Sequence, residues 1–191
     1  GGITAGLEHD LGNVTLKGDL GSIICGDSDA STGPALKLLS ARSIGPRGTV
    51  TQDAGGTLIS NIAGSLGALK ISGDIRDATI RATNANDGSD GKIGSVSIGG
   101  SLIGGIDFGG SIFASGDIGP VKIKRNLVGG FGEESGEIRC EGNLGPVIVG
   151  GDIMGSTGIS SGRVFSTGAM GDVRIGGDLT GGAGDNSGQL L

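Results

Sequence analysis

The chain lacks the residues that fill the centre of a compact globule. Among 191 residues it has no tryptophan, no tyrosine and only four phenylalanines. Large aromatic side chains normally dominate a thick core. The apolar residues are instead mostly Ile, Leu and Val at regular places, which argues against disorder. The composition therefore favours a thin core made of aliphatic layers.

Other shortages exclude whole classes of protein. With only four prolines and no continuous Gly-X-Y triplet, the 45 glycines do not make a collagen. No apolar run approaches the ~18 residues of a membrane-spanning helix. The net charge of −6 and the isoelectric point near 4.6 disfavour nucleic acid and anionic membrane surfaces, because both attract basic patches. We expect one acidic, β-rich domain over residues 1–191, forming a segment of a longer protein.

A short motif recurs along the chain: an apolar residue, a glycine and then alternating apolar positions. It begins at Leu11, Leu66, Ile93, Ile118, Leu144 and Met170. The last four intervals are 27, 25, 26 and 26 residues. The longer interval between Leu11 and Leu66 has room for a degenerate copy, which we place near Ile44 ("IGPRGTVTQ"). A fixed period of this length is typical of solenoids and other repeat architectures.

We expect three short strands in each copy. Apolar residues alternate with other residues within each of the three segments, and no helical period occurs. The first strand is followed by Gly-Asp or a relative and a second strand, and the third lies in segments such as "SGEIRC" (135–140), "SGRVFS" (161–166) and "SGQLL" (187–191). A propeller blade would need ~40–45 residues. A left-handed hexapeptide helix would need strict six-residue steps, and these copies do not divide in that way. A β-sandwich would not repeat its sequence. The sequence therefore predicts an all-β solenoid of about six or seven coils, each of ~26 residues.

The segments "IGPVKIKRNLVGG" (118–130), "LGPVIVGGDIMGS" (144–156) and "MGDVRIGGDLTGG" (170–182) carry a family resemblance. They resemble glycine-rich repeats of large secreted bacterial surface proteins, the class that includes autotransporter and filamentous-haemagglutinin-like adhesins. The resemblance covers nearly the whole chain. It implies a right-handed parallel β-helix and an exported protein, located outside the cell or on its surface.

Several glycine-rich loops are acidic. We place "CGDSDASTG" (25–33), "FGEESGE" (131–137) and "GAGDNSG" (182–188) between second and third strands, and "TNANDGSDGK" (83–92) one strand later. Calcium prefers oxygen ligands, and it is the one cofactor these loops suggest. The candidate ligands are Asn86, Asp87, Asp90, Asp27, Asp29 and Asp185. The alternative is a set of solvated turns in which Asp, Asn and Ser cap backbone amides.

A second set of polar residues follows the Gly-Gly corner of each copy. Its members are Asp19, Asp74, Ser101, Asn126, Asp152 and Asp178. Stacked aspartates repel one another, and Ser101 and Asn126 interrupt the column. We expect these side chains to hold the corner by accepting hydrogen bonds from the next backbone amide.

A third set is basic: Lys122, Lys124 and Arg125, with Lys70 and Arg174 in the same outward column as Lys122. Polysaccharide lyases on parallel β-helices combine a Lys or Arg base with clustered carboxylates and calcium, so a carbohydrate-active lyase or hydrolase is the alternative function. These cations face no obvious carboxylate cluster, and we expect them to offset the aspartate column instead. The sole histidine, His9, precedes the first clear coil, so no catalytic residues are assigned.

Two further expectations concern the ends and the cysteines. "SGQLL" offers nothing to cover the last coil, so we expect end-to-end contact or an oligomer there. Cys25 and Cys140 lie four coil starts apart, roughly 19 Å at the strand spacing, whereas a disulfide needs Cα atoms within ~7 Å. Taken together, the sequence favours a non-catalytic structural or adhesive module whose side loops bind a glycan or a protein surface.

Overall fold

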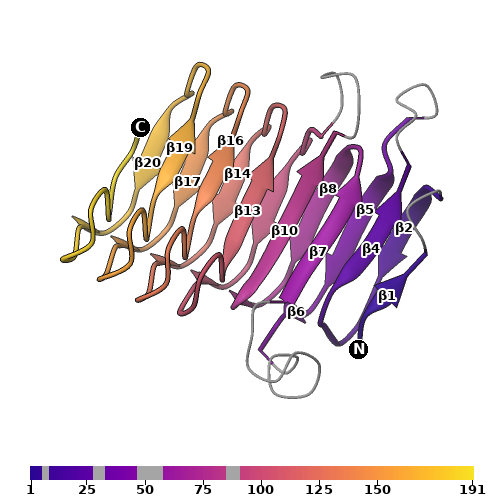
Figure 1. Cartoon of the computed structure of the whole chain (residues 1–191), viewed down its shortest axis with the longest axis horizontal. Helices are drawn as coiled ribbons and strands as arrows, with labels where there is room; N and C mark the ends of the chain where they lie inside the picture. Colours follow the sequence, from indigo (N-terminus) through magenta and orange to yellow (C-terminus); the bar gives the residue numbers. More distant parts are fainter. Residues whose placement is uncertain (6–8, 28–32, 47–57, 85–90) are drawn as a thin grey trace.

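The computed structural model describes residues 1–5, 9–27, 33–46, 58–84 and 91–191, which form a right-handed parallel β-helix. Each coil adds one strand to each of three parallel sheets of seven strands. Successive coils lie side by side along a rod, with the two termini at opposite ends (Figure 1). About 46% of the described residues are in strands or bridges, and none of them is in a helix. The predicted fold class is confirmed.

The strands are short and repeat in the order A, B, C along the chain. Sheet A contains β1 (Ile3–Thr4), β4 (Ile23–Gly26), β7 (Leu58–Ala63), β10 (Ala78–Thr83), β13 (Ser111–Ala114), β16 (Ile138–Cys140) and β19 (Val164–Ser166). Sheet B contains β2 (Leu11–Thr15), β5 (Leu36–Ala41), β8 (Leu66–Ile71), β11 (Val96–Ile98), β14 (Val121–Ile123), β17 (Val147–Val149) and β20 (Val173–Ile175). Sheet C contains β3 (Asp19–Leu20), β6 (Ser43–Ile44), β9 (Ile75–Arg76), β12 (Leu102–Ile103), β15 (Leu127–Val128), β18 (Ile153–Met154) and β21 (Leu179–Thr180).

The degenerate copy begins at Leu36, so its placement near Ile44 was wrong. Leu36 pairs in register with both Leu11 and Leu66, whereas Ile44 lies in sheet C and pairs with Ile75. The strand "LKLLSA" has Lys37 where the other copies have the glycine of the motif, so the pattern did not detect it. Of the predicted third strands, "SGQLL" forms a single bridge, Val164↔Leu190, and no strand.

The core consists of columns of aliphatic side chains that repeat from coil to coil. One column of sheet B holds Leu69, Val96, Val121 and Val147, each at most 2% exposed. Because every coil adds the same small layer, burial is continuous along the rod without any large aromatic side chain. The last coil is less covered, and Leu179 is 44% exposed.

Cys25 and Cys140 are unpaired, as predicted, and both point into the core from sheet A. Burial raises the pKa of Cys25 to about 11, and the charge of Asp10 adds to the effect. Burial also raises the pKa of Cys140. A raised pKa keeps both groups as thiols at neutral and mildly alkaline pH, although only the thiolate is nucleophilic.

We therefore expect both cysteines to resist alkylation in the native protein. Treatment with iodoacetamide at pH 8, followed by intact mass measurement, should show no adduct within the time that labels both thiols in denaturant. Rapid labelling of either thiol in the folded protein would contradict this burial.

The polar column at the corner between sheets B and C connects each coil to the next. The side chains of Asp74, Ser101, Asn126 and Asp152 each accept a hydrogen bond from the backbone amide of their counterpart one coil later, at 2.8, 3.3, 3.1 and 2.9 Å. Asp19 accepts a hydrogen bond from the Ser43 hydroxyl. The predicted corner role is confirmed, and the amide concerned belongs to the following coil.

This ladder explains why glycine precedes most corner residues. A Cβ at Gly151 would lie 2.0 Å from Oδ1 of Asn126, and one at Gly177 would lie 1.9 Å from Oδ1 of Asp152. The space is occupied by the side chain that reaches from the previous coil. Where the previous coil has the shorter Ser101, the equivalent position holds Arg125. The ladder thus accounts for the second glycine at Gly100, Gly151 and Gly177, whereas a Cβ at the first glycine of each pair would meet a backbone carbonyl of the previous coil.

We predict that Gly151→Ala destabilises the protein by about 1–3 kcal/mol, the cost of leaving a buried or half-buried hydrogen bond unmade. The new methyl group must displace the Asn126 carboxamide from the amide of Asp152. In an Asn126→Ser background the same change should cost much less, because a serine hydroxyl leaves room for Cβ, as Ser101 does for Arg125. Urea unfolding of the two single variants and the double variant measures the coupling, and strictly additive effects would refute the steric explanation.

Candidate functional site

The outer face of sheet A carries a column in which arginine and phenylalanine alternate. The strand register aligns Arg81 in β10, Phe113 in β13, Arg139 in β16 and Phe165 in β19. All four side chains point outward, because their neighbours on both sides along each strand point into the core. The column therefore presents planar cations and aromatic rings in turn along the rod.

These side chains contact one another as cation–π pairs. The Cζ of Arg81 lies 5.5 Å from the ring centroid of Phe113, and the Cζ of Arg139 lies 5.7 Å from the rings of both Phe113 and Phe165. Arg163 lies over the Phe165 ring from the neighbouring column, at 4.9 Å. Guanidinium groups over aromatic faces attract by about 0.5–1 kcal/mol at exposed sites. The stacking holds the outer face of sheet A in one arrangement.

A second column lies beside the first and is covered by the loops that connect sheet C to sheet A. It contains Thr79, Ser111, Glu137 and Arg163. The Thr79 hydroxyl donates to the carbonyl of Phe108, and the Ser111 hydroxyl donates to that of Glu134. Both carbonyls belong to the covering loop of the next coil. These two hydrogen bonds hold the loops over the edge of sheet A.

Each covering loop turns through a residue in the left-handed region. These residues are Phe108, Glu134, Ser160 and Asn186, with φ of 57°, 48°, 56° and 56°. They recur at 26-residue intervals, so the same loop is built four times in succession. Non-glycine residues in this region are uncommon, and their regular recurrence marks one conserved backbone path within the chain.

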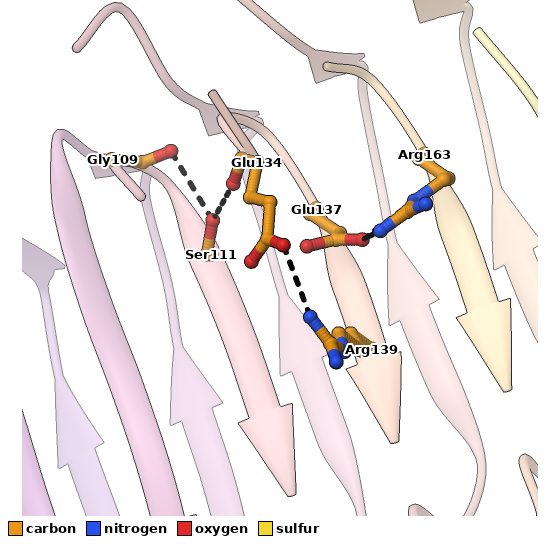
Figure 2. Close-up of polar contacts among 6 residues, drawn as sticks. All are labelled: Gly109, Ser111, Glu134, Glu137, Arg139 and Arg163. Atoms are coloured by element: carbon orange, nitrogen blue, oxygen red, sulfur yellow. Dashed lines mark hydrogen bonds and ion pairs between the residues drawn. The ribbon is translucent and has the colours of Figure 1, made fainter. Parts of the chain in front are cut away.

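Two ion pairs lie beneath and beside these loops (Figure 2). Arg163 contacts Oε1 of Glu137 through Nη2 at 2.5 Å and through Nε at 2.7 Å. The side chains of Glu137 and Arg163 are only 3% and 10% exposed. Arg139 contacts Oε1 of Glu134 at 3.1 Å, and both of those side chains are about one third exposed.

Burial raises the pKa of Glu137 to about 7, because its desolvation outweighs the attraction of Arg163. Between the ordinary value of 4.5 and this value, the folded state binds more protons than the unfolded state. The free energy of unfolding should therefore fall as pH rises from about 4.5 to about 7, by at most ~1.4 kcal/mol per pH unit from this group.

Urea unfolding of the wild type and of Glu137→Gln across that pH range tests the assignment. The variant cannot titrate at this position, so its stability should fall less steeply with pH. Identical pH dependences for the two proteins would contradict the raised pKa.

A groove of about 520 Å³ runs along this face. Its exposed wall includes Arg81, Phe108, Ile59 and Glu141. The ring of Phe113 and the Glu134–Arg139 ion pair also line the groove. Phe108 is 49% exposed and Ile59 is 42% exposed. Of the ion pairs in the described residues, none involves Arg81 or Glu141. The groove thus offers apolar surface together with one cation and one carboxylate available to a ligand.

Two acidic groups of the groove are held in ion pairs. Glu134 and Glu137 each have an arginine partner, and Glu137 lines the groove with only 3% of its side chain exposed. The Ser111 hydroxyl donates to the Glu134 carbonyl at 2.6 Å. No histidine or cysteine lines the groove among the described residues, so a nucleophile with an adjacent base is not assembled here.

The proposed calcium ligands are only partly within the described residues. Asn86, Asp87, Asp90 and Asp29 lie outside them. Asp27 follows β4 in the first coils, whereas Asp185 follows β21 in the last coil, so these two are not brought together. Within the described ranges, no group of three or more His, Cys, Asp or Glu side chains has the geometry of a metal site.

The placement of one acidic loop was wrong. Cys25 and Gly26 belong to β4, so the segment that begins there follows the third strand of its coil. The loops at 131–137 and 182–188 follow second strands instead, and residues 28–32 lie outside the described residues. The error follows from the undetected copy at Leu36, which shifted the assignment of strands in the first two coils.

The basic residues occupy sheet B, on a different face. Lys70, Lys122 and Arg174 share one outward column, as predicted, with Ser97 and Ile148 between them. In the described part of the chain, the ion pairs are Lys92–Asp117, Arg139–Glu134 and Arg163–Glu137, so the offset of the aspartate column by the basic residues stays a prediction. Asp74 and Asp152 of the corner accept hydrogen bonds from backbone amides.

Comparison with protein-family models, with curated proteins and with solved structures gives no match. The part of the chain that the structure describes contains no helix that could serve as a membrane span. The class defined by the fold is that of the parallel β-helices, and the function has to be argued from the surfaces of this chain alone.

Proposed function

We propose that this chain is a non-catalytic structural and adhesive module of an exported bacterial protein, and that the groove on sheet A binds a surface glycan. The observation that carries the proposal is the pairing of two of the groove's three acidic groups. Glu137 and Glu134 are each held by an arginine, which leaves Glu141 as the carboxylate of the groove outside the described ion pairs. Glycoside hydrolysis generally uses two carboxyl groups that flank the scissile bond, and one unpaired carboxylate does not supply that pair.

The groups left available match the chemistry of a sugar. Arg81 and Glu141 can form charge-assisted hydrogen bonds with hydroxyl and carboxylate groups, which are stronger than neutral ones. Phe108 and Ile59 offer apolar surface to the faces of sugar rings. Binding therefore takes place on the strand face of sheet A, where the covering loop through Phe108 supplies one wall. This differs from binding by the acidic side loops alone.

A rigid scaffold supports this role. The three sheets are continuous across all seven coils, and the side-chain ladder at the B–C corner ties each coil to the next. A preorganised surface loses little conformational entropy when a ligand binds. A repeat architecture of this kind can hold the groove at a distance from the cell as part of a longer rod.

Glycan-array binding by the purified chain tests the proposal. The wild type should bind a subset of neutral or acidic surface glycans, and Arg81→Gln and Phe108→Ala should each weaken that binding by about fivefold or more, the loss of ~1 kcal/mol. Arg76→Gln, which removes an exposed cation from sheet C, is the matched control and should bind normally. Absence of binding to every glycan, or equal losses in all three variants, would overturn the assignment of the groove.

A further inference from the structure

The outer face of sheet B carries a basic stripe that the proposed function does not use. We define the stripe as Lys70, Lys122 and Arg174 in one column, with Lys17, Arg42, Lys124 and Arg125 beside it. All seven side chains are exposed. Because the whole chain has a net charge of −6, this concentration of cations on one face is not a consequence of composition.

The three ion pairs of the described residues do not include the cations of the stripe, although Arg42 lines a small groove with Asp19 and Asp74. The aspartates of the neighbouring corner are directed to backbone amides of the next coil. The stripe therefore presents charge that an external anion can neutralise.

A surface groove of about 720 Å³ lies at the amino-terminal end of the stripe. Its wall includes Lys17, Arg42 and Lys70 together with the hydroxyls of Ser40 and Ser97, and no carboxylate lines it. Cations and hydroxyl groups in one open groove suit an anion that also carries hydroxyl groups. The proximity of both kinds of group favours an acidic sugar over a simple inorganic ion.

The spacing of the cations along the rod indicates how far apart the charges of a matching ligand would lie. Lys70, Lys122 and Arg174 occur on every second coil, which places them roughly 9.6 Å apart at the strand spacing. Ser97 stands between the first two. Duplex DNA carries one charge per ~1.7 Å, so the cations of the column would meet only a small fraction of its phosphates. A disaccharide with one acidic sugar is of comparable length to two coils.

We infer that the basic stripe on sheet B binds an extended acidic polysaccharide that carries one carboxylate per disaccharide and lies along the rod axis. Each carboxylate meets one cation of the column, and the neutral sugars between them lie over Ser97 in the first interval and over the exposed Ile148 in the second. The surface is on a different sheet from the groove beside Phe108, so the two sites are independent.

Binding to hyaluronan oligosaccharides, measured by calorimetry at low salt, tests the inference. Lys122→Gln should weaken binding about two- to fivefold, and the triple change of Lys70, Lys122 and Arg174 to Gln should weaken it by about tenfold or more, as expected for exposed charge pairs. Affinity should fall as salt is raised, because exposed charges are screened. Carboxyl-reduced hyaluronan should not bind.

Two controls make the outcome decisive. Arg76→Gln on sheet C removes one cation from another face and should bind hyaluronan like the wild type. Thermal unfolding of the triple variant should match the wild type, since its three side chains are exposed. No binding of hyaluronan, an unchanged affinity in the triple variant, or tighter binding to duplex DNA or phosphatidylserine vesicles would overturn the inference.

Discussion

Replacing Arg163 with methionine should destabilise the protein by about 3–5 kcal/mol, the usual cost of removing one partner from a buried ion pair. Arg163 makes two contacts with Oε1 of Glu137, at 2.5 and 2.7 Å, and the carboxylate is only 3% exposed. The change leaves a buried charge without its partner. Arg163→Met also removes the cation above the Phe165 ring. Urea unfolding at pH 8 measures the loss.

Two comparisons separate the ion pair from other effects. Arg81→Met removes an exposed arginine that contacts an aromatic ring on the same sheet, and it should cost about 1 kcal/mol or less. The double variant Glu137→Met with Arg163→Met should recover most of the stability, because an apolar pair can replace a buried ion pair with little loss. A loss in Arg163→Met no greater than that in Arg81→Met would contradict the buried ion pair.

Replacing Gly136 with alanine should cost about 3 kcal/mol or more. Gly136 has φ of +60°, which costs an L-residue roughly 1–2 kcal/mol. A Cβ there would also lie 2.1 Å from the carbonyl oxygen of Val128 and 2.6 Å from the amide nitrogen of Gly129. Backbone atoms cannot move aside as a flexible side chain can, and overpacking adds roughly 1–3 kcal/mol.

Gly33→Ala is the matched control for Gly136→Ala. Gly33 has φ of +101°, but a Cβ there would meet nothing within 4 Å. The control should cost only the conformational term, which is at least as large at +101° as at +60°, so any excess loss in Gly136→Ala is a lower limit for the effect of the close approach of the loop to β15. Since Gly136 lies between Glu134 and Glu137, Gly136→Ala should also weaken ligand binding in the sheet A groove. Equal losses of stability in the two variants would contradict the close approach.

The repeat and the core could be predicted from the sequence because both depend on local alternation. A strand with one buried face needs apolar residues at every second position, and this pattern recurs in the copies from Leu66 onward. The copy at Leu36 was missed because Lys37 replaces the glycine of the motif. This copy is identified only by the strand pairing of Leu36 with Leu11 and Leu66. Strand pairing is a property of neighbouring coils and not of one copy.

The corner ladder was also predictable, since it requires only that equivalent residues stack. The same reasoning could have found the sheet A column, because Arg139 and Phe165 are one coil apart, as are Glu137 and Arg163. Those residues lie in third strands, whose starts are less regular than the glycine motif. Aligning "TIRA", "SIFA", "EIRC" and "RVFS" would have revealed the alternating arginine and phenylalanine.

The burial of Glu137 could not be predicted in this way. Its low exposure depends on the loop from sheet C, which crosses the edge of sheet A through a left-handed Glu134. That backbone path is maintained by hydrogen bonds such as the one from the Ser111 hydroxyl to the Glu134 carbonyl. A glycine-rich segment with three glutamates is expected to be an exposed turn unless these contacts between coils are known.

The central claim, that the groove on sheet A binds a glycan without cleaving it, is tested most directly by following the fate of a bound glycan. The chain would be incubated with the glycan that it binds most tightly on the array, and the glycan recovered and analysed by mass spectrometry. The account predicts that the wild type retains the glycan, that Arg81→Gln and Phe108→Ala retain less, and that the recovered glycan has an unchanged mass. Shortened or unsaturated products formed by the wild type would show a lyase or hydrolase and contradict the account.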